Sequence, residues 1–600
     1  MIFKRKRRQS GENVIDTKKT LGKLVAYLKP QYLLIAIALV AEIGAAVLNL
    51  VGPVYAGQAT NIIQQGLTGS IDMDALMVCV FIEIGVYGGC AVLSWLLGYI
   101  MTTVTQTLGK RMRRDIACKI NKLPLEFFDK SSHGDTLSRV TNDVDTVGQS
   151  LNQSIITFVM SVVMLVGSIV MMFITSPILA ASAIGSTILG FIVMAIIMSK
   201  SQKYFTAQQV ALGQVDGHVE ETFSGQIVVK AFGAEKSTGK KFKKINDKLF
   251  YSAYKSQFFG STLGPLMNFV GNLGYVTVFV VGAYLVINRG MDIGVITAFT
   301  LYIRLFSQPL SQLAQVMTSL QPATAAAARV FEFLDSDELS PEKEGALKSL
   351  EGVKGDVVFD HVKFGYTPDR TIINDFSATV KAGQKVAIVG PTGAGKTTLV
   401  NLLMRFYELD DGRITIDGTP IDEMTREAVH SVFGMVLQDT WLFKGTVRDN
   451  VAYSVNADEK SVERAIEKAG LAHFVHSLPD GFDTVLDENM TVSAGQKQLI
   501  TIARAMVEDA PMLILDEATS SVDTRTEIVI QQAMDELTKG RTSFVIAHRL
   551  STIKNADLIL VVDKGDIVES GTHDELLKKK GFYYDLYSAQ FANAEEMGAA

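Results

Sequence analysis

The segment G-P-T-G-A-G-K-T at 390–397 combines glycines, a lysine and hydroxyl side chains in an order that suits phosphate binding. It follows K-V-A-I-V and precedes T-L-V-N-L-L-M-R-F, which predicts a strand, a loop and a helix. Glycines let backbone N–H groups wrap around phosphate oxygens, and the start of a helix adds a positive dipole. We expect Lys396 to reach the β- and γ-phosphates of a nucleotide and Thr397 to ligate Mg²⁺. Alone, the pattern indicates a P-loop NTPase and nothing narrower.

A second segment, M-L-I-L-D-E at 512–517, is an apolar run that ends in two carboxylates. We expect Asp516 to hold Mg²⁺ through water and Glu517 to polarise the water that attacks the γ-phosphate. The competing interpretation is a buried strand with an acidic exposed end, which the spacing from the P-loop disfavours. His548 follows the apolar run S-F-V-I-A and is expected beside the γ-phosphate. The other histidines are expected to be structural or solvated: His133, His218, His361, His430, His473, His476 and His573.

Three further segments complete an ordered set. They are F-G-Y at 364–366, V-L-Q-D-T-W-L-F around Gln438, and V-S-A-G-Q-K-Q from Val492, while L-D-E-A-T-S-S-V-D extends the acidic strand to Asp523. In this order the segments resemble the ATP-binding cassette of ABC transporters. Together with the apolar segments that precede the cassette, the resemblance covers roughly residues 20–590, and it implies ATP and Mg²⁺ as ligands.

The resemblance also implies a role for each matching residue. Tyr366 would stack on adenine, Gln438 would report the nucleotide state to the rest of the chain, and His548 would be the switch histidine. The implied catalytic residues are Glu517, His548, Gln438 and Lys396, and the implied metal-binding residues are Thr397, Gln438 and Asp516. The implied ATP-binding residues are Tyr366, Gly390, Pro391, Thr392, Gly393, Ala394, Gly395, Lys396, Thr397 and Thr398. Val492, Ser493, Ala494, Gly495 and Gln496 would face the ATP of a partner chain, and Ser521 and Asp523 would form the D-loop.

Apolar segments are concentrated before about residue 320. Hydrophobic residues make up 48% of the chain, and its mean hydropathy is +0.23. Since about 20 apolar residues cross a bilayer, we predict six spans. Two are clear and joined by T-S-P, and four are weaker: 155–175 and 178–198, then 31–54, 75–102, 264–287 and 292–314.

Lysine and arginine are distributed unevenly between these spans. The stretches 57–74 and 174–177 contain none, and 287–292 contains only Arg289, whereas 103–150 contains eight and 199–256 contains ten. This bias places the N-terminus and both long loops in the cytoplasm, on the inner side of the cytoplasmic membrane.

Both long loops have a helix-forming composition, so the spans are expected to continue into the cytosol. With a rise of ~1.5 Å per residue, 25 helical residues reach on the order of 35 Å. The turns are expected near 125–135 and 216–225.

Charge and cysteine content add few constraints. The net charge of -6 gives no reason to expect a nucleic-acid partner. K-R-K-R-R at 4–8 is followed by polar sequence, so we interpret it as a basic cytoplasmic tail near anionic lipid head groups, in preference to a cleaved signal or a nuclear localisation sequence. Cys79, Cys90 and Cys118 form no C-x-x-C pair and no disulfide framework.

Beyond a charged linker, short β-rich runs alternate with helical segments and predict an α/β domain with a largely parallel sheet. The expected fold class is multi-domain: an all-α polytopic membrane domain of six helices with long cytoplasmic extensions, then an α/β P-loop NTPase domain. The expected divisions are a tail at 1–17, a transmembrane domain at 18–320, a linker at 321–352, a nucleotide-binding domain at 353–592 and a tail at 593–600.

With six spans before one cassette, the chain resembles a half-transporter of the ABC exporter type. The resemblance implies a head-to-tail dimer in which each ATP lies between one P-loop and the other chain's signature. The two cytoplasmic turns would couple ATP binding to alternating access across the membrane. A second half-transporter chain is therefore required.

The signature departs from the L-S-G-G-Q that is usual in this family. Ser493 is expected to cap a helix from about 494 to 507, with its hydroxyl facing the partner's γ-phosphate. Ala494 adds a methyl where backbone approaches phosphate, and the preceding segment departs further, with Glu488 as the remnant of a glutamate usual there. Intact catalytic residues beside an altered signature favour a heterodimer, although a homodimer stays open.

Substrate identity is weakly specified by the sequence. A soluble ABC ATPase is excluded by the spans, and the absence of an N-terminal protease-like segment disfavours a peptide exporter. Multidrug-type export of hydrophobic or amphiphilic compounds is favoured, while a lipid or lipid-linked flippase and a gated channel stay open. Glu42 and Glu83 lie within apolar spans, where a carboxylate is costly. They either line a substrate pathway for cations or sit near an interface or a partner chain.

Overall fold

The computed structural model describes residues 17–67, 69–350, 352–367, 369–455, 457–486, 492–516, 523–547 and 550–589. The chain divides into two compact units. The first, here called the helical unit, runs to Asn121 and continues over His133–Ser336. The second, called the α/β unit, combines Lys122–Ser132 with the chain from Asp337 onward.

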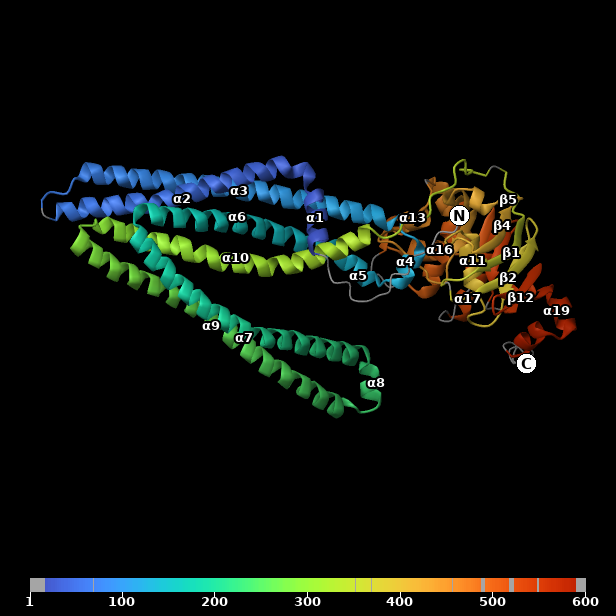
Figure 1. Ribbon diagram of the computed structural model, residues 1–600. Helices are drawn as coiled ribbons and strands as arrows, with labels where there is room; N and C mark the ends of the chain where they lie inside the picture. The colour runs from blue at the N-terminus through green and yellow to red at the C-terminus, as the bar shows by residue number, and fades with distance from the viewer. Residues whose placement is uncertain are drawn as a thin grey trace. The chain divides into compact units, whose positions relative to one another are not determined.

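Long helices make up the helical unit (Figure 1). They are joined by short turns, which include the 3₁₀ turn η1 and the π-helical turn η2. The elements are α1 (Thr17–Tyr27), η1 (Lys29–Gln31), α2 (Tyr32–Gly66), α3 (Met73–Ile120), α5 (His133–Ser138), η2 (Arg139–Asp143), α6 (Val144–Thr175), α7 (Pro177–Ser224), α8 (Gln226–Ala231), α9 (Glu235–Arg289) and α10 (Ile293–Leu334).

Several of these helices are apolar enough to cross a membrane. Within the described residues, five helical segments meet the length and composition required. They are Lys29–Gly66, Met73–Ile120, Gly134–Thr175, Asn268–Arg289 and Ile293–Leu313, and α7 contributes the shorter apolar stretch Pro177–Ile188. The predicted all-helical domain of membrane type is confirmed.

Helices α2, α3, α6 and α10 pack together, whereas α7 and α9 run side by side along their length and are joined by α8 (Figure 1). The centre of the packing contains Phe299 and Tyr302 of α10, both fully buried. Tyr302 donates a hydrogen bond to the carbonyl oxygen of Leu50 in α2 at 3.2 Å. This bond satisfies a phenol that would otherwise be costly to bury.

The same two helices meet more closely near the start of α10. A side chain added at Gly294 would place its Cβ 2.0 Å from the carbonyl oxygen of Gly57, so only glycine fits this contact. Asn61 of α2 accepts a hydrogen bond from the backbone N–H of Gly294 at 2.6 Å. Since the N-cap residue of α10, Asp292, makes no side-chain cap, Asn61 supplies an acceptor for the first turn from a neighbouring helix.

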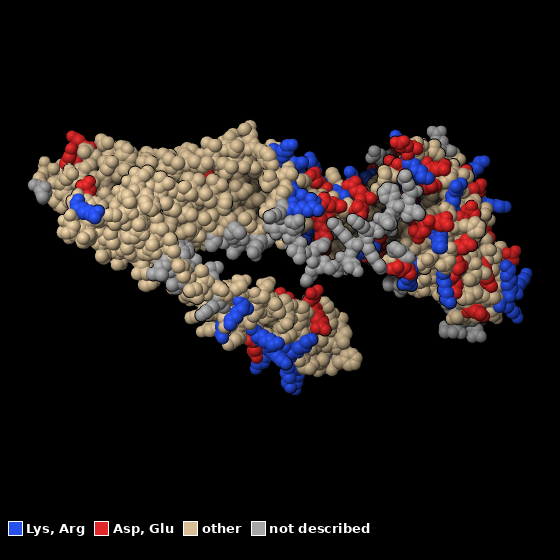
Figure 2. Space-filling model, in the orientation of Figure 1, with Lys and Arg blue, Asp and Glu red and all other residues tan. Residues whose placement is uncertain are grey.

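The surface of the packed helices suits lipid more than water. In the face shown in Figure 2, charged side chains are nearly absent between the two ends of the bundle, and they gather on the α7–α9 pair. Large apolar side chains point outward from α2 and α3, including Leu33, Val40 and Trp95, which are 75%, 70% and 72% exposed. Exposed apolar surface on this scale marks a membrane or partner contact.

In the described part of the α/β unit, the strands form two larger sheets and a short ribbon. The antiparallel sheet has the order β2-β1-β4-β5, the six-stranded sheet has the order β12-β11-β3-β10-β9-β6, and β7 pairs with β8. Within the six-stranded sheet, only β12 is antiparallel to its neighbour. The strands are β1 (Val357–Phe364), β2 (Ile373–Val380), β3 (Lys385–Val389), β4 (Asp411–Ile416), β5 (Thr419–Pro420), β6 (Phe433–Val436), β7 (Gly445–Thr446), β8 (Val485–Leu486), β9 (Met512–Asp516), β10 (Thr542–Ile546), β11 (Leu558–Asp563) and β12 (Asp566–Gly571).

Helices cover the six-stranded sheet, and its strands β3, β9, β10 and β11 are buried along nearly their whole length. The predicted α/β domain with a largely parallel sheet is therefore confirmed. The helical elements are α11 (Lys396–Leu403), η3 (Ile421–Glu423), α12 (Arg426–Ser431), α13 (Val447–Val451), α14 (Glu459–Lys468), α15 (Ala472–Ser477), η4 (Gly481–Asp483), α16 (Ala494–Glu508), α17 (Thr524–Thr538), α18 (Leu550–Lys554) and α19 (His573–Lys579).

One short helix from the first half of the chain also belongs to the α/β unit. This is α4 (Leu125–Lys130), which lies in sequence between α3 and α5. The backbone N–H of Leu339 donates to the carbonyl oxygen of Lys122 at 2.9 Å, which ties the residues before α4 to the segment after α10. A segment that connects two long helices of the helical unit is thus packed as part of the α/β unit.

Candidate functional site

The P-loop connects β3 to α11, as the strand–loop–helix pattern predicts. Two of its glycines are required by geometry. A Cβ at Gly390 would lie 2.1 Å from the carbonyl oxygen of Val562, and Gly395 has a φ of 105° at the helix start. Because Gly395 has no side chain to cap α11, the first N–H groups of the helix lack an intrahelical acceptor. The loop therefore presents amides to an anion.

Lys396 is the first residue of α11 and is buried, with 8% of its surface exposed. Its Nζ donates to the carbonyl oxygens of Gly390 and Pro391 at 2.8 and 3.0 Å. Burial lowers the pKa of Lys396 below its usual range, and the nearby carboxylate of Asp516 opposes this by favouring the charged form. The ammonium is therefore held against the backbone carbonyl groups at the start of the loop.

The carboxyl ends of the parallel strands bring the other predicted residues to the same edge. In the sheet register, Asp516 of β9 pairs with Ile546 of β10, and Ile546 pairs with Ile388 of β3. Gln438 lies two residues beyond the end of β6, which is the other neighbour of β9, and is exposed. Asp516 and Gln438 thus lie at the edge from which the P-loop leaves. The predicted catalytic residues Glu517 and His548 lie outside the described residues.

These residues fit a nucleotide with Mg²⁺. Thr397 is exposed in the first turn of α11. Asp516 is the last residue of β9, which is separated from β3 by one strand, β10. A hydroxyl and a carboxylate are oxygen ligands of the kind that Mg²⁺ binds, usually together with water and phosphate. The exposed loop residues Thr392 and Gly393 leave the amides of the loop accessible.

Tyr366 follows β1 and is half-buried beside this loop. Its hydroxyl lies 3.2 Å from Oγ1 of Thr398 in α11. Its ring is nearly perpendicular to those of Phe364 and Tyr407, with centroid distances of 5.0 and 5.1 Å. The ring is therefore fixed in place next to the P-loop helix, where a base attached to bound phosphates has aromatic surface to stack on.

The signature segment forms the start of α16, and the predicted cap is confirmed. Oγ of Ser493 accepts from the backbone N–H of Gln496 at 3.2 Å, and Oε1 of Gln496 accepts from the N–H of Ser493 at 3.0 Å. This capping box leaves the hydroxyl hydrogen of Ser493 free to donate. Val492 packs against the neighbouring core, Gly495 is buried, and Ala494 is exposed as the first helical residue.

Asp523 has a visible structural role as well as its predicted D-loop role. It is the N-cap of α17 and accepts from the backbone N–H of Thr526 at 3.0 Å. Hydrogen bonds from the hydroxyl and from the backbone N–H of Thr526 lower the pKa of the Asp523 carboxyl below its usual range. Ser521, the other predicted D-loop residue, and Glu488 before the signature lie outside the described residues.

The two carboxylates predicted within the spans have different environments. Glu42 in α2 is 4% exposed and forms no hydrogen bond or ion pair with any residue that the structure describes. Glu83 in α3 is half-exposed. A buried carboxylate without a partner is costly, so Glu42 is the better candidate for a functional residue.

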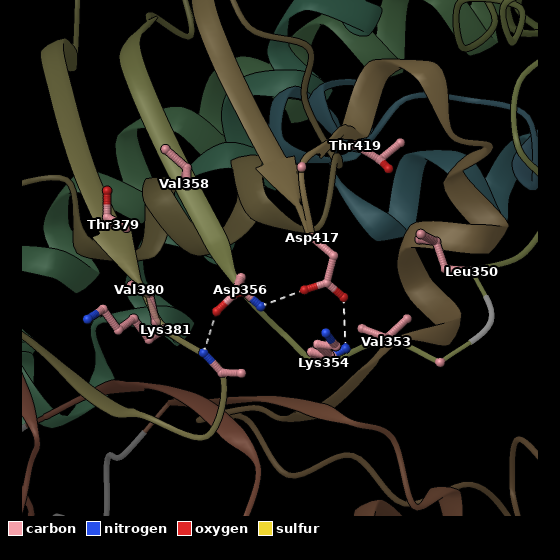
Figure 3. Close-up of a pocket in the computed structure, with 13 residues that line it drawn as sticks. Leu350, Val353, Lys354, Asp356, Val358, Thr379, Val380, Lys381, Asp417 and Thr419 are labelled. Carbon is pink, nitrogen blue, oxygen red and sulfur yellow. Dashed lines mark hydrogen bonds between the residues drawn. The ribbon is translucent and has the colours of Figure 1, made fainter.

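A surface cavity of about 880 Å³ lies elsewhere in the α/β unit (Figure 3). Its carboxylates are already used by the backbone. Asp417 accepts from the N–H groups of Lys354 and Asp356, each at 2.8 Å, and Asp356 accepts from the N–H of Ala382 at 2.7 Å. None of its lining residues belongs to the P-loop, the signature or the segment around Gln438. We therefore assign it no role in nucleotide binding.

Sequence reasoning missed Tyr407 and its partner. The Tyr407 hydroxyl donates to the carboxylate of Asp129 in α4, which connects the ring beside Tyr366 to the turn from the first half of the chain. The sequence shows that Tyr407 is an aromatic residue four positions after α11. It does not indicate the partner, because Asp129 is distant from Tyr407 in sequence and has no motif around it.

Comparison with known families matches both halves of the chain. Residues 35–310 match the ABC transporter transmembrane region, and residues 373–520 match the ABC transporter family model. The second match includes the P-loop, Gln438, the signature and Asp516.

Individual relatives also match across most of this chain. A fatty acid ABC transporter ATP-binding/permease protein of Mycobacterium bovis is 45% identical over 523 residues, which cover 86% of this chain and 82% of the relative. An ATP-dependent lipid A-core flippase of Syntrophus aciditrophicus is 36% identical, with 86% and 85% covered. A probable multidrug resistance ABC transporter ATP-binding/permease protein of Bacillus subtilis is 34% identical, with 86% and 76% covered.

Proposed function

Because this chain belongs to the ABC transporter family as an exporter half-transporter with an ATPase cassette, we propose that it drives hydrophobic or amphiphilic compounds out of the cytoplasm. The observation that carries the proposal is the fusion of a helical membrane domain to the cassette, with α4 from the membrane half packed in the α/β unit. A cassette that holds part of the membrane half can convert nucleotide state into movement of helices.

The residues divide the work as follows. Lys396 and the P-loop amides hold the phosphates, Tyr366 stacks on the base, and Thr397, Asp516 and Gln438 hold the metal. Mg²⁺ would neutralise phosphate charge during transfer. In this proposal Glu517 orients water toward the γ-phosphate and His548 acts as the switch histidine, as the motifs that contain them imply. Ser493 serves the ATP of a second chain, since its cap leaves a hydroxyl hydrogen free.

We place the protein in the cytoplasmic membrane with its N-terminus and cassette in the cytoplasm. Two observations support this orientation. The residues between α2 and α3 and between α6 and α7 contain no lysine or arginine, whereas the long extensions are rich in both. Charged side chains also gather on the α7–α9 pair at the end away from the apolar segments (Figure 2).

The functional unit is a dimer of half-transporters. The tip of the α7–α9 pair exposes large apolar side chains, among them Phe223, Ile227 and Phe232 at 83%, 85% and 83%. Exposed aromatic and aliphatic groups at the end of a charged cytoplasmic hairpin favour a protein partner. We propose a heterodimer, because the catalytic face of this chain is complete in sequence and its signature is altered at Ala494.

Two substrate classes have separate support. The names of the relatives from Mycobacterium bovis and Syntrophus aciditrophicus favour acyl lipids or lipid-linked molecules. The buried carboxylate of Glu42, together with the name of the Bacillus subtilis relative, favours cationic drugs. Both classes partition into membranes, which suits helices with apolar outer surfaces.

Reconstituted vesicles test the proposal. We expect ATP-dependent movement of amphiphiles, and the Glu517→Gln variant is expected to lose transport because the water-orienting carboxylate is gone. Stimulation of ATP hydrolysis by cationic dyes, fatty acids and phospholipids separates the substrate classes. A response to lipids alone would exclude the multidrug class, and transport by Glu517→Gln at the unmodified rate would refute the assigned chemistry.

A further inference from the structure

One hydrogen bond joins α4 to the part of the cassette that surrounds the base-stacking residue. The hydroxyl of Tyr407 donates to the carboxylate of Asp129. Burial raises the pKa of Tyr407, and the hydrogen bond and charge of Asp129 raise it further, so the phenol stays protonated and can donate at neutral pH. The Tyr407 phenol is therefore the donor of this hydrogen bond, and the Asp129 carboxylate is its acceptor.

Three aromatic rings meet at this point: Phe364, Tyr366 and Tyr407, here called the aromatic triangle. Tyr407 lies 5.5 Å from Phe364 and 5.1 Å from Tyr366 between ring centroids, with interplanar angles of 61° and 89°. Phe364 is buried at the end of β1 and contacts Tyr366 at 5.0 Å. Because each ring contacts both others, Tyr366 cannot tilt without displacing Tyr407.

The aromatic triangle is also attached to the P-loop helix. Tyr366 reaches Thr398 in the first turn of α11, and Tyr407 follows the end of α11 by four residues. The turn between α11 and Tyr407 is fixed by Arg405, which has a φ of 53° and donates to the carbonyl oxygen of Met424 at 2.5 Å. The segment between the P-loop helix and the Tyr407 hydroxyl, which is hydrogen-bonded to α4, therefore has little conformational freedom.

We propose that Tyr407 is a positioning residue that transmits occupancy of the base-binding site to α4 through Asp129. The proposal rests on the proposed function, since it requires a purine stacked on Tyr366. A stacked base restrains the Tyr366 ring, the restrained ring holds Tyr407, and the Tyr407 hydroxyl stays aimed at Asp129. The route senses the base, and it uses no residue of the segment around Gln438.

Hydrogen–deuterium exchange on the full transporter in lipid nanodiscs tests this route. In the unmodified protein, saturating MgATP is expected to slow exchange in a peptide over 122–132 by about tenfold, because local opening of α4 is suppressed. Tyr407→Phe keeps the ring and removes the hydroxyl, so it is expected to abolish the MgATP-dependent slowing in this peptide. Protection of the P-loop over 390–398 by MgATP is expected to persist in that variant.

Two further variants make the result specific. Asp129→Ala removes the acceptor and is expected to match Tyr407→Phe, and the double variant is expected to be no worse than either single one. Tyr584→Phe removes a hydroxyl from another partly exposed tyrosine of the same unit and is expected to behave like the unmodified protein. If Tyr407→Phe loses its fold, Asp129→Ala tests the bond from the other side.

The outcomes separate this inference from the proposed function. Absence of P-loop protection by MgATP in the unmodified protein would overturn both. P-loop protection without any change over 122–132, or with a change that survives both Tyr407→Phe and Asp129→Ala, would overturn the inference alone.

Discussion

At the residue scale, Ala494 is where the signature departs from the usual glycine. Its methyl group is exposed at the first helical position of α16, next to an intact Ser493 cap. Because the cap is preserved, we expect alanine in place of glycine at position 494 to affect contact with a phosphate more than formation of the helix. Ala494→Gly is therefore expected to raise ATP turnover at the composite site by about twofold to fivefold, against a helix-propensity cost of about 1 kcal/mol at most.

Steady-state ATP hydrolysis by the purified assembly measures this effect, with kcat and KM determined separately. Ala494→Val serves as the opposite change, since two more methyl groups at this position are expected to lower turnover. Equal rates for all three proteins would contradict the expected gain at the composite site.

A second residue-scale prediction concerns His430, which lies in α12 with its ring 5.4 Å from that of Phe406 between centroids. Its Nε2 contacts the carbonyl oxygen of Met404 at 2.9 Å, and burial lowers its pKa below the usual 6.5. In the window below about 6.5 and above the folded pKa, the unfolded chain binds a proton that the folded chain does not, so stability falls as pH falls.

Thermal unfolding of the transporter at about pH 7.5 and pH 5.5 checks this sign. His430→Gln keeps an N–H donor without the titration and is expected to show a smaller loss of Tm at the lower pH. An identical loss of Tm in both proteins would assign the acid sensitivity to other groups.

At the element scale, the contact between α2 and α10 depends on two glycines. Gly294→Ala would place a methyl 2.0 Å from the carbonyl oxygen of Gly57, so the helices must separate. This separation would also lengthen the hydrogen bond between Asn61 and Gly294. We expect Gly294→Ala to destabilise the helical unit by about 1–3 kcal/mol, the range for overpacking a close contact.

Gly271→Ala is the matched control, because Gly271 is also helical and nothing lies within 4 Å of an added Cβ. Its thermal stability in detergent is expected to equal or exceed that of the unmodified protein, since alanine favours helix. Equal stability of the two variants would mean that α2 and α10 do not approach as closely as the structure shows.

Local features of the fold were predictable, and long-range ones were not. The Ser493 cap and the strand–loop–helix at the P-loop follow from residues within a few positions of one another. The order β3-β10-β9-β6, which brings Gln438 to the edge beside Asp516, requires the packed sheet. The bond between Tyr407 and Asp129 spans 278 residues of sequence, and no periodicity or motif reports such a contact.

At the scale of the whole molecule, the proposed function gives this chain two half-sites with different roles. One is the P-loop face with Lys396 and Asp516, and the other is the capped helix start at Ser493. In a head-to-tail dimer, each half-site is completed by the other chain. Substitutions in the two half-sites therefore report whether the chains of the dimer are identical.

The last prediction uses this asymmetry on the assembly isolated through a tag on this chain. Lys396→Ala removes the ammonium that the P-loop carbonyls hold, and it is expected to lower ATP hydrolysis by about 10²-fold or more, because a preorganised charge at the phosphates is lost. Ser493→Ala is expected to lower it by about threefold or less, because in a heterodimer the intact P-loop face uses the partner's signature and not Ser493. In a homodimer Ser493 would complete both sites, so Ser493→Ala would reduce hydrolysis nearly as much as Lys396→Ala. Equal losses in the two variants, together with one polypeptide in the purified assembly, would establish the homodimer and reject the heterodimer.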